Sequence, residues 1–195
     1  MIASPQSSRM TAEEYLVWEP KQALRYEYCD GQVFAMTGGT KGHNRLALNL
    51  YSALVDKVDA SGCEINTSDV KVLVKEGNAY RYPDLIVSCD ERDKRETDFY
   101  QFPTLIVEVL SSSTANVDRD DKFQEYIQIP TLQEYLLINT KRKQVECYRR
   151  GEGRMWLYYS YIAGESIHLE SIGVDVAVTQ LYQNVRLDEP TDSTA

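Results

Sequence analysis

The sequence contains few of the residues that most often bind transition metals. Its 195 residues include only two histidines, and its four cysteines form no CxxC pair. A histidine-rich metal site is therefore excluded, and the cysteine spacing does not suggest zinc. Any metal would be bound by carboxylate and carbonyl oxygens, which suit Mg²⁺ or Mn²⁺. We expect reduced thiols that mostly fill space at all four cysteines: Cys29, Cys63, Cys89 and Cys147.

Long apolar segments are also missing. No apolar run approaches the roughly 18 residues that a membrane-spanning helix needs, and residues 1–16 lack the basic start and apolar stretch of a signal peptide. These absences predict a soluble cytoplasmic protein with no membrane partner. With 43% hydrophobic and 26% charged residues, the chain has the composition of a single globular domain spanning 1–195. We expect its core at about 11–185 and a flexible acidic tail at 188–195.

Positive charge is scarce. The chain has 21 basic and 30 acidic residues, a net charge of −9, which argues against nucleic-acid binding through a broadly basic surface. Residues 141–154 are the exception, because they hold six of the 21 basic residues and only two acids. Two interpretations stay open, a solvated hairpin and a patch that contacts phosphates. In the second, the candidate nucleic-acid contacts are Lys141, Arg142, Lys143, Arg149 and Arg150.

Several local patterns predict secondary structure. Thr11 followed by Glu14 is a capping-box signature and predicts a short helix at 11–18. Asp30-Gly31 predicts a hairpin turn within 25–36. Apolar residues repeating every fourth position from Leu46 to Val58 predict an amphipathic helix that ends at Ser61-Gly62.

The rest of the chain is predicted to be mainly β-structure. A second helix is expected at 118–129, where Pro130 stops it. The strands are expected at 63–67, 70–74, 80–90, 105–110, 134–140, 143–150, 155–164 and 166–172. This order favours an α+β fold with a mixed central sheet rather than a regular βαβ alternation.

Two carboxylates occupy unusual positions in this pattern. Glu108 lies in the middle of the apolar run LIVEVL, and Asp84 follows Pro83 at the start of the apolar run LIV. A buried carboxylate costs several kcal/mol unless it is compensated. Consecutive strands are usually neighbours, so the two acids are expected to lie close together. Each acid alone fits a salt bridge or a strand-end cap, but the pair favours a divalent cation, which would supply the missing positive charge.

Lys122 is a third candidate. It lies 14 residues after Glu108, in the first turns of the predicted helix, and Asp118 precedes it by one helical turn. One interpretation is a surface i,i+4 ion pair with Asp118. In the other, the ammonium points back to the strand end, where it stabilises developing negative charge or orients a water.

At this point the sequence resembles the Uma family, a bacterial group of proposed restriction endonucleases in the PD-(D/E)XK nuclease superfamily. The most specific part is the EVLSxST…DxxxKxxxY arrangement with EYLLI behind it. The similarity spans most of the chain and is carried by MTAEEYL, YEYCDGQVFAMTGGTKGHN, YPDLIV, LIVEVLSSST, DRDDKFQEY and LQEYLLIN.

The resemblance implies a restriction-endonuclease-like core with helices flanking a mixed sheet, extended by an N-terminal hairpin and C-terminal strands. It also implies that Asp84, Glu108 and the backbone carbonyl of Val109 bind Mg²⁺ (or Mn²⁺). The superfamily usually has a lysine two residues after the glutamate, but this sequence has Leu110 there. In the Uma pattern that lysine is moved to the following helix, which corresponds to Lys122.

Two further positions match the family more loosely. The match implies that Glu27 is an extra metal or water ligand, and that His43 binds phosphate or transfers a proton near pH 7. His43 could instead satisfy backbone groups at a helix start.

The function implied is metal-dependent hydrolysis of DNA phosphodiester bonds by a homodimer. The alternative is a catalytically silent nuclease-fold module that binds nucleic acid or a protein, and Leu110 and the charge of −9 favour it. Hydrolysis of another phosphate ester is also compatible with these residues, since a fold does not fix a substrate.

Overall fold

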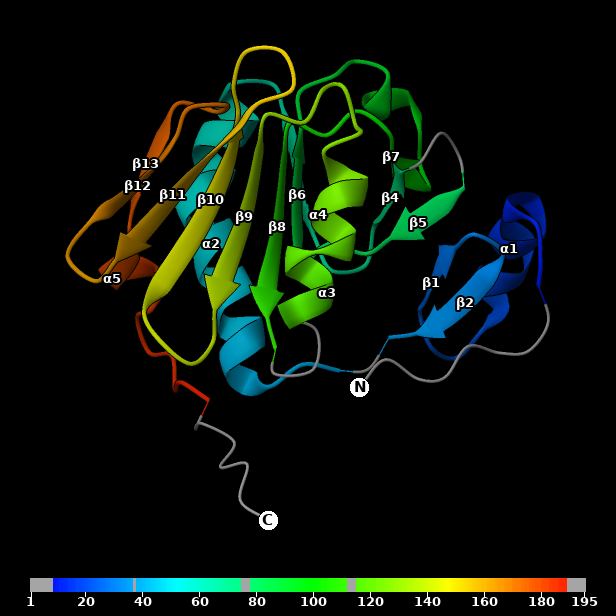
Figure 1. Cartoon of the computed structure of the whole chain (residues 1–195), viewed down its shortest axis with the longest axis horizontal. Helices are drawn as coiled ribbons and strands as arrows, with labels where there is room; N and C mark the ends of the chain where they lie inside the picture. The colour runs from blue at the N-terminus through cyan, green and yellow to red at the C-terminus, as the bar shows by residue number, and fades with distance from the viewer. Residues whose placement is uncertain (1–8, 37, 75–77, 112–114, 189–195) are drawn as a thin grey trace.

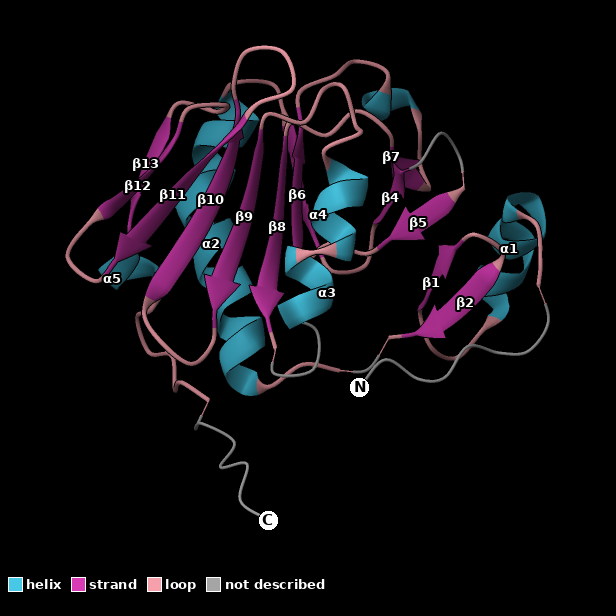
Figure 2. Ribbon diagram, in the orientation of Figure 1, coloured by secondary structure: helices cyan, strands magenta, loops and turns pink. Residues whose placement is uncertain are grey.

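The protein has an α+β fold built on two mixed β-sheets, with helices on both faces of the larger one (Figure 1). The structure is a computed structural model that describes residues 9–36, 38–74, 78–111 and 115–188. Figure 2 separates the helices from the strands in the same orientation. The predicted fold class is therefore confirmed.

The larger sheet has six strands in the order β11-β10-β9-β8-β6-β3. Only β8 and β9 run parallel to each other, and the other neighbours are antiparallel. Its strands are β3 (Glu64–Thr67), β6 (Leu85–Ser88), β8 (Leu105–Leu110), β9 (Glu134–Asn139), β10 (Gln144–Arg150) and β11 (Trp156–Ile162).

The smaller sheet has five strands in the order β2-β1-β5-β4-β7, and β12 and β13 form a separate pair. The strands are β1 (Tyr26–Cys29), β2 (Gln32–Ala35), β4 (Lys71–Val74), β5 (Ala79–Arg81), β7 (Phe99–Tyr100), β12 (Ser166–Leu169) and β13 (Val174–Ala177). The helices are α1 (Ala12–Trp18), η1 (Glu19–Lys21), α2 (Lys41–Ala60), η3 (Asp93–Arg95), α3 (Ala115–Arg119), α4 (Asp121–Tyr126) and α5 (Val178–Leu181).

The locally encoded elements match their predictions. Both hydrogen bonds of the capping box start α1, from the Glu14 amide to Thr11 Oγ1 and from the Thr11 amide to Glu14 Oε2. Asp30 and Gly31 both have positive φ, 49° and 87°, as the turn between β1 and β2 requires. Helix α2 ends before Ser61, and Gly62 leaves it with φ 76°.

The core lies on both faces of the larger sheet. On one face, Leu46, Leu50, Leu54 and Val58 of α2 pack with alternate residues of β8: Leu105, Val107 and Val109. On the other face, Ile106 and Leu110 pack with Tyr126 of α4. Because strand side chains alternate, Glu108 faces α3 and α4, which cover that side in Figure 1.

Two predicted elements are each divided in the structure. The strand expected at 80–90 is β5 and β6, which belong to different sheets and are joined through Pro83-Asp84. Pro83 has no amide hydrogen to continue a ladder, which is the physical reason for the break. The helix expected at 118–129 is α3 and α4, interrupted at Asp120 (φ −103°, ψ −73°).

The expectation of four reduced cysteines is wrong, because Cys63 and Cys89 form a disulfide. Glu64 lies opposite Ser88 in the β3–β6 pair, so the next step of that register places Cys63 opposite Cys89. Their Cα atoms are 4.2 Å apart, as expected for directly opposed residues. Cys29 and Cys147 keep their thiols.

Some predictions lie partly outside the described residues. These are the tail at 188–195 beyond Asp188 and the end of the LIVEVLSSST motif. Within the described parts of the chain, no helix is long and apolar enough to cross a membrane.

Candidate active site

Adjacent strands bring Asp84 and Glu108 to the same edge of the larger sheet. Leu85 of β6 lies opposite Val107 of β8, so one further step of the antiparallel register places Asp84 opposite Glu108. Asp84 Oδ2 accepts a hydrogen bond of 2.7 Å from the Val109 amide. Because the amide and carbonyl of one residue in an extended strand point the same way, the Val109 carbonyl also faces the Asp84 side.

Glu108 is a buried carboxylate with two donors. It is 3% exposed, and its Oε1 accepts hydrogen bonds from Lys122 Nζ and Tyr126 Oη, both at 2.9 Å. Burial raises the pKa of Glu108 well above its usual value, and the negative charges of Asp118, Asp84 and Glu27 act in the same direction. Lys122 opposes them without reversing the direction. Glu108, Asp118, Asp84 and Glu27 outnumber the two cations of the site, Lys122 and Arg81.

Lys122 is at the centre of this charge cluster. Its Nζ lies 2.9 Å from Glu108, 3.2 Å from Asp118 and 3.6 Å from Glu27. Burial alone would lower the pKa of Lys122, but these carboxylates outweigh it and raise the pKa well above its usual value. The lysine is therefore a fixed cation. Leu110, where the lysine of related folds usually lies, packs in the apolar core.

Glu27 joins the site from the smaller sheet. Its Oε2 accepts a hydrogen bond from Arg81 at 2.9 Å, and its Oε1 accepts one from the Tyr82 amide at 3.2 Å. Arg81 also holds Glu125 through two bonds of 2.8 and 2.9 Å. Burial raises the pKa of Glu27, but Lys122 and Arg81 outweigh it and lower the pKa below its usual value. Glu27 is therefore an anion between two buried cations.

His43 reaches the site from the first turn of α2. Thr40 caps this helix by accepting a hydrogen bond from the His43 amide, and His43 Nε2 lies 3.2 Å from Asp84 Oδ2. Burial lowers the pKa of His43, but Asp84 and the Val109 main chain raise it, and the net shift is upward. The structure thus gathers His43, Asp84, Glu108, Lys122 and Glu27 from five different elements or their connections.

Sequence reasoning missed Arg81, Glu125 and the hydroxyl of Tyr126. The position of Tyr126 one turn after Lys122 is the signal that could have revealed its hydroxyl. Arg81 lies only three residues before Asp84, but its partners come from distant segments. No local pattern therefore points to it.

The five candidate nucleic-acid contacts are separated. Lys141, Arg142 and Lys143 are exposed in the β9–β10 turn, beyond the end of β9 that lies beside the end of β8. Arg149 and Arg150 lie at the opposite end of β10 and are used inside the fold. Arg149 pairs with Glu134 at 2.8 Å, and Arg150 donates to the carbonyls of Ile127, Ile129 and Leu132.

The turn is tied to the start of α2. Thr40 Oγ1 donates to Asp188 at 3.2 Å, and the Asp188 amide donates to the Thr140 carbonyl at 2.9 Å. Lys41 and Arg45, both exposed on the first turns of α2, therefore belong to the same edge of the molecule. We call Lys41, Arg45, Lys141, Arg142 and Lys143 the basic edge.

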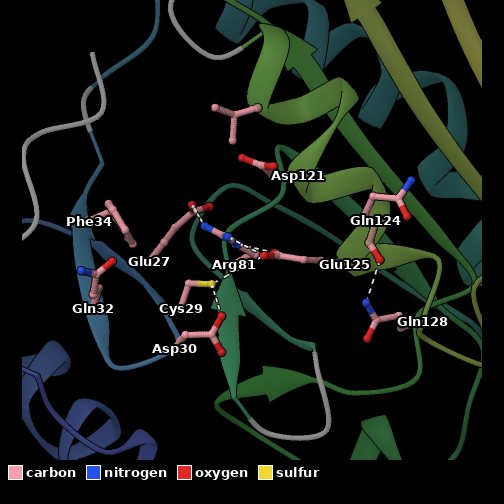
Figure 3. A pocket seen from close by; sticks show the side chains of 11 residues that line it. Glu27, Cys29, Asp30, Gln32, Phe34, Arg81, Asp121, Gln124, Glu125 and Gln128 are labelled. Atoms are coloured by element: carbon pink, nitrogen blue, oxygen red, sulfur yellow. Dashed lines mark hydrogen bonds and ion pairs between the residues drawn. The ribbon is translucent and has the colours of Figure 1, made fainter.

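A cleft of about 420 Å³ opens beside the site, between the β1–β2 hairpin and α4. Figure 3 shows Gln32 and Phe34 on one wall and Asp121 and Gln124 on the other, with Arg81 between them. Four acids and a single basic residue line the cleft: Glu27, Asp30, Asp121, Glu125 and Arg81. This acidic lining does not suit a phosphate backbone.

The donor set fits Mg²⁺ bound mainly by water and substrate. Among the residues that the structure describes, no three His, Cys, Asp or Glu side chains form a metal-binding group. Mg²⁺ usually takes only one or two carboxylates and keeps several waters, and Asp84 with Glu108 provides that number. The buried Oδ1 of Asp118 makes no hydrogen bond within the described residues, although Lys122 Nζ is 3.2 Å away. Because the acids of the site outnumber Lys122 and Arg81, the site favours a bound cation.

Asp84, directly before β6, and Glu108, in the neighbouring β8, lie at one edge of a mixed sheet, which fits the restriction-endonuclease-like core that the sequence resemblance implies. The model of the Uma2 family, described as “Putative restriction endonuclease”, matches residues 12–179, and the chain belongs to this family. The resemblance noted in the sequence is thereby confirmed.

Two similar proteins of Synechocystis sp. are named as uncharacterized. One is 38% identical over 188 residues, covering 95% of this chain and 99% of its own length. The other is 37% identical over 165 residues, covering 83% and 92%. A crystal structure from Anabaena variabilis, described as “a putative nuclease belonging to DUF820”, has a TM-score of 0.74 at 16% identity and covers 89% of this chain and 97% of its own. At that identity the likeness concerns the fold alone.

Proposed function

We propose that the protein is a metal-dependent endonuclease that hydrolyses DNA phosphodiester bonds. One observation carries the proposal: the Lys122 ammonium lies 2.9 Å from Glu108, although Leu110 occupies the usual lysine position. A cation supplied by the helix thus reaches the volume that a lysine on the strand would reach. Family membership supports the nuclease class.

Asp84, Glu108 and the Val109 carbonyl would hold Mg²⁺ or Mn²⁺. When bound, such an ion lowers the pKa of a water and polarises the scissile phosphate. The Val109 amide fixes the Asp84 carboxylate through Oδ2. Lys122 and Tyr126 fix Glu108 through Oε1, so neither donor occupies Oε2.

Lys122 acts as an electrostatic group rather than a base. Its raised pKa keeps it protonated, so it cannot accept the proton of the attacking water. A buried ammonium instead stabilises the negative charge that develops on the phosphate oxygens. Asp118 and Glu27 also hold the ammonium, at 3.2 and 3.6 Å.

Glu27 and His43 are positioning residues in this proposal. Both oxygens of Glu27 are engaged by Arg81 and Tyr82, which suits an outer-shell water better than direct binding of a second metal. His43 holds Asp84 and lies next to the exposed Lys41, at the end of α2 that faces an incoming phosphate. The basic edge would contact the DNA backbone.

Nicking of supercoiled plasmid tests the proposal. We expect cleavage by the wild type with Mg²⁺ or Mn²⁺, none with EDTA, and a loss of at least about 100-fold in Lys122→Met, the scale of losing one transition-state donor. Lys57→Met, which changes an exposed lysine at the far end of α2, is the matched control and should cleave normally. Equal rates for Lys122→Met and wild type would remove Lys122 from the mechanism.

A catalytically silent module is the second candidate. The apolar Leu110 favours it, as does the pairing of Lys122 with three carboxylates, which resembles a structural ion cluster. DNA binding in a gel-shift assay without cleavage at any metal concentration would support this candidate and contradict the endonuclease.

A further inference from the structure

An exposed apolar strand lies at one edge of the larger sheet. Five large side chains between residues 155 and 162 are 36–56% exposed: Met155, Leu157, Tyr158, Tyr159 and Ile162. They lie on or beside β11, the last strand of the six-stranded sheet, which Figure 1 shows at its margin. Proteins usually protect such edges with charges, prolines or short strands, but the seven residues of β11 include no charge and no proline.

The outer edge of β11 offers hydrogen-bonding groups in a definite pattern. The Met155 carbonyl accepts from the Gly151 amide, so it points toward β10. Alternation along the strand then directs the amide and carbonyl groups of Trp156, Tyr158 and Ser160 away from β10. Ile162 also points outward, but its amide and carbonyl are used by Glu165 in the following turn.

The three residues with outward amide and carbonyl groups are spaced evenly, with Trp156 two residues before Tyr158 and Ser160 two residues after it. If a second β11 pairs antiparallel with its centre at Tyr158, Trp156 of one copy lies opposite Ser160 of the other, and Tyr158 lies opposite itself. All three outward residues of both strands can then exchange hydrogen bonds, as in a regular antiparallel ladder. Leu157 lies opposite Tyr159, and apolar and aromatic pairs of this kind stabilise neighbouring strands.

The charges around β11 are compatible with this self-pairing. The nearest flanking charges have opposite signs, with Arg154 before the strand and Glu165 after it. In an antiparallel pair, Arg154 therefore lies at the same end as the partner's Glu165. No like charges meet along the strand, although the whole chain carries −9.

We propose that β11 is a homodimer interface, in which two copies join their six-stranded sheets into one continuous sheet about a two-fold axis at Tyr158. Such isologous contacts are the commonest route to closed dimers. The proposal does not depend on the endonuclease activity, because it rests on a surface distant from Glu108 and its test requires no substrate.

Disulfide trapping tests the register directly. Opposed residues in a hydrogen-bonded antiparallel pair have Cα atoms about 5.5 Å apart, within the range that a disulfide spans. We expect Tyr158→Cys to form a covalent dimer under mild oxidation. Leu48→Cys, which changes an exposed residue of α2, and the wild type should stay unlinked. Absence of the Tyr158→Cys cross-link would overturn the proposed register.

Light scattering after gel filtration tests the dimer itself. We expect the wild type and Leu48→Lys to elute with twice the mass of the chain, and Tyr158→Lys to elute with the mass of one chain. Circular dichroism would verify that Tyr158→Lys remains folded. A monomeric wild type, or a dimeric and folded Tyr158→Lys, would overturn the proposal. A monomeric wild type would instead favour a different protein strand as the partner of β11.

Discussion

At the scale of single residues, the site depends on a lysine and a glutamate from different elements. Glu108 lies in a strand whose other side chains are apolar, and Lys122 from α4 compensates it at 2.9 Å. Leu110, which replaces the expected lysine, contributes to the core beside Tyr126 instead. The fold therefore uses position 110 for packing and position 122 for charge.

Lys122 and Glu108 should differ in their effect on stability. Removing the cation in Lys122→Met takes the paired charge away from the buried Glu108 and Asp118, whereas Glu27 keeps Arg81, so we expect a loss of about 3–5 kcal/mol in the free energy of unfolding. The raised pKa of Glu108 favours its protonated form in the folded state, so its stabilising effect exists at low pH and is lost as pH rises through that pKa. At neutral pH, Glu108→Gln should therefore retain or gain stability.

Urea unfolding at pH 7 measures the free energy of unfolding of both variants and of the wild type. We expect Glu108→Gln to be at least as stable as the wild type and to lack nuclease activity. A Glu108→Gln variant that is as unstable as Lys122→Met would show that Glu108 is a structural partner of the lysine and little more.

The cysteines give a second residue-scale prediction. Burial, followed by the charge of Glu134, raises the pKa of the Cys147 thiol to about 12. Because only the thiolate reacts, a thiol reagent at pH 8 should not modify Cys147 in the folded protein. Denatured but unreduced protein should titrate two thiols, since Cys63 and Cys89 are joined. Four titratable thiols would contradict the disulfide.

At the scale of elements, local signals predicted more than long-range ones did. The capping box of α1, the Asp30-Gly31 turn and the apolar period of α2 each depend on a few neighbouring residues, and all three predictions are confirmed. Three features depend instead on partners far away in the chain. They are the division of 80–90 between two sheets, the Cys63–Cys89 bond, and the roles of Arg149 and Arg150. Such partners cannot be read from a local pattern.

Helix α2 provides an element-scale prediction at Gly42. A Cβ atom there would lie 2.6 Å from the Arg186 carbonyl oxygen, so the C-terminal segment packs on this glycine. Alanine is about 1 kcal/mol better than glycine inside a helix, but we expect Gly42→Ala to lose about 1–3 kcal/mol from this overpacking. Thermal unfolding would measure this loss of stability. The control is Gly38→Ala, where an added Cβ atom has no neighbour within 4 Å among the described residues. A stabilised Gly42→Ala would contradict the close packing.

At the scale of the whole molecule, the acidic chain places five exposed basic residues at one edge beside the site. The basic edge combines the start of α2 with the β9–β10 turn, and Asp188 connects the two by hydrogen bonds. The neighbouring cleft is acidic, so the DNA backbone is directed to the edge rather than into the cleft.

DNA affinity should therefore depend strongly on salt and on the basic edge. Each phosphate contact contributes about 0.9 to the slope of log K against log salt concentration. We expect the triple variant Lys141→Ala, Arg142→Ala, Lys143→Ala to reduce that slope by up to about 3, in fluorescence anisotropy without a divalent metal. Replacing Lys57 by alanine should leave it unchanged. An unchanged slope in the triple variant would exclude the turn from the interface.

The nuclease mechanism requires Asp84 and Glu108 to bind a divalent cation together, and calorimetric titration with Mn²⁺ measures that binding. We expect binding to the wild type and to Glu91→Gln, which removes an exposed carboxylate away from the site. We expect no binding to Glu108→Gln. Absence of binding in the wild type, or equal binding in Glu108→Gln, would contradict the claim and the endonuclease mechanism built on it.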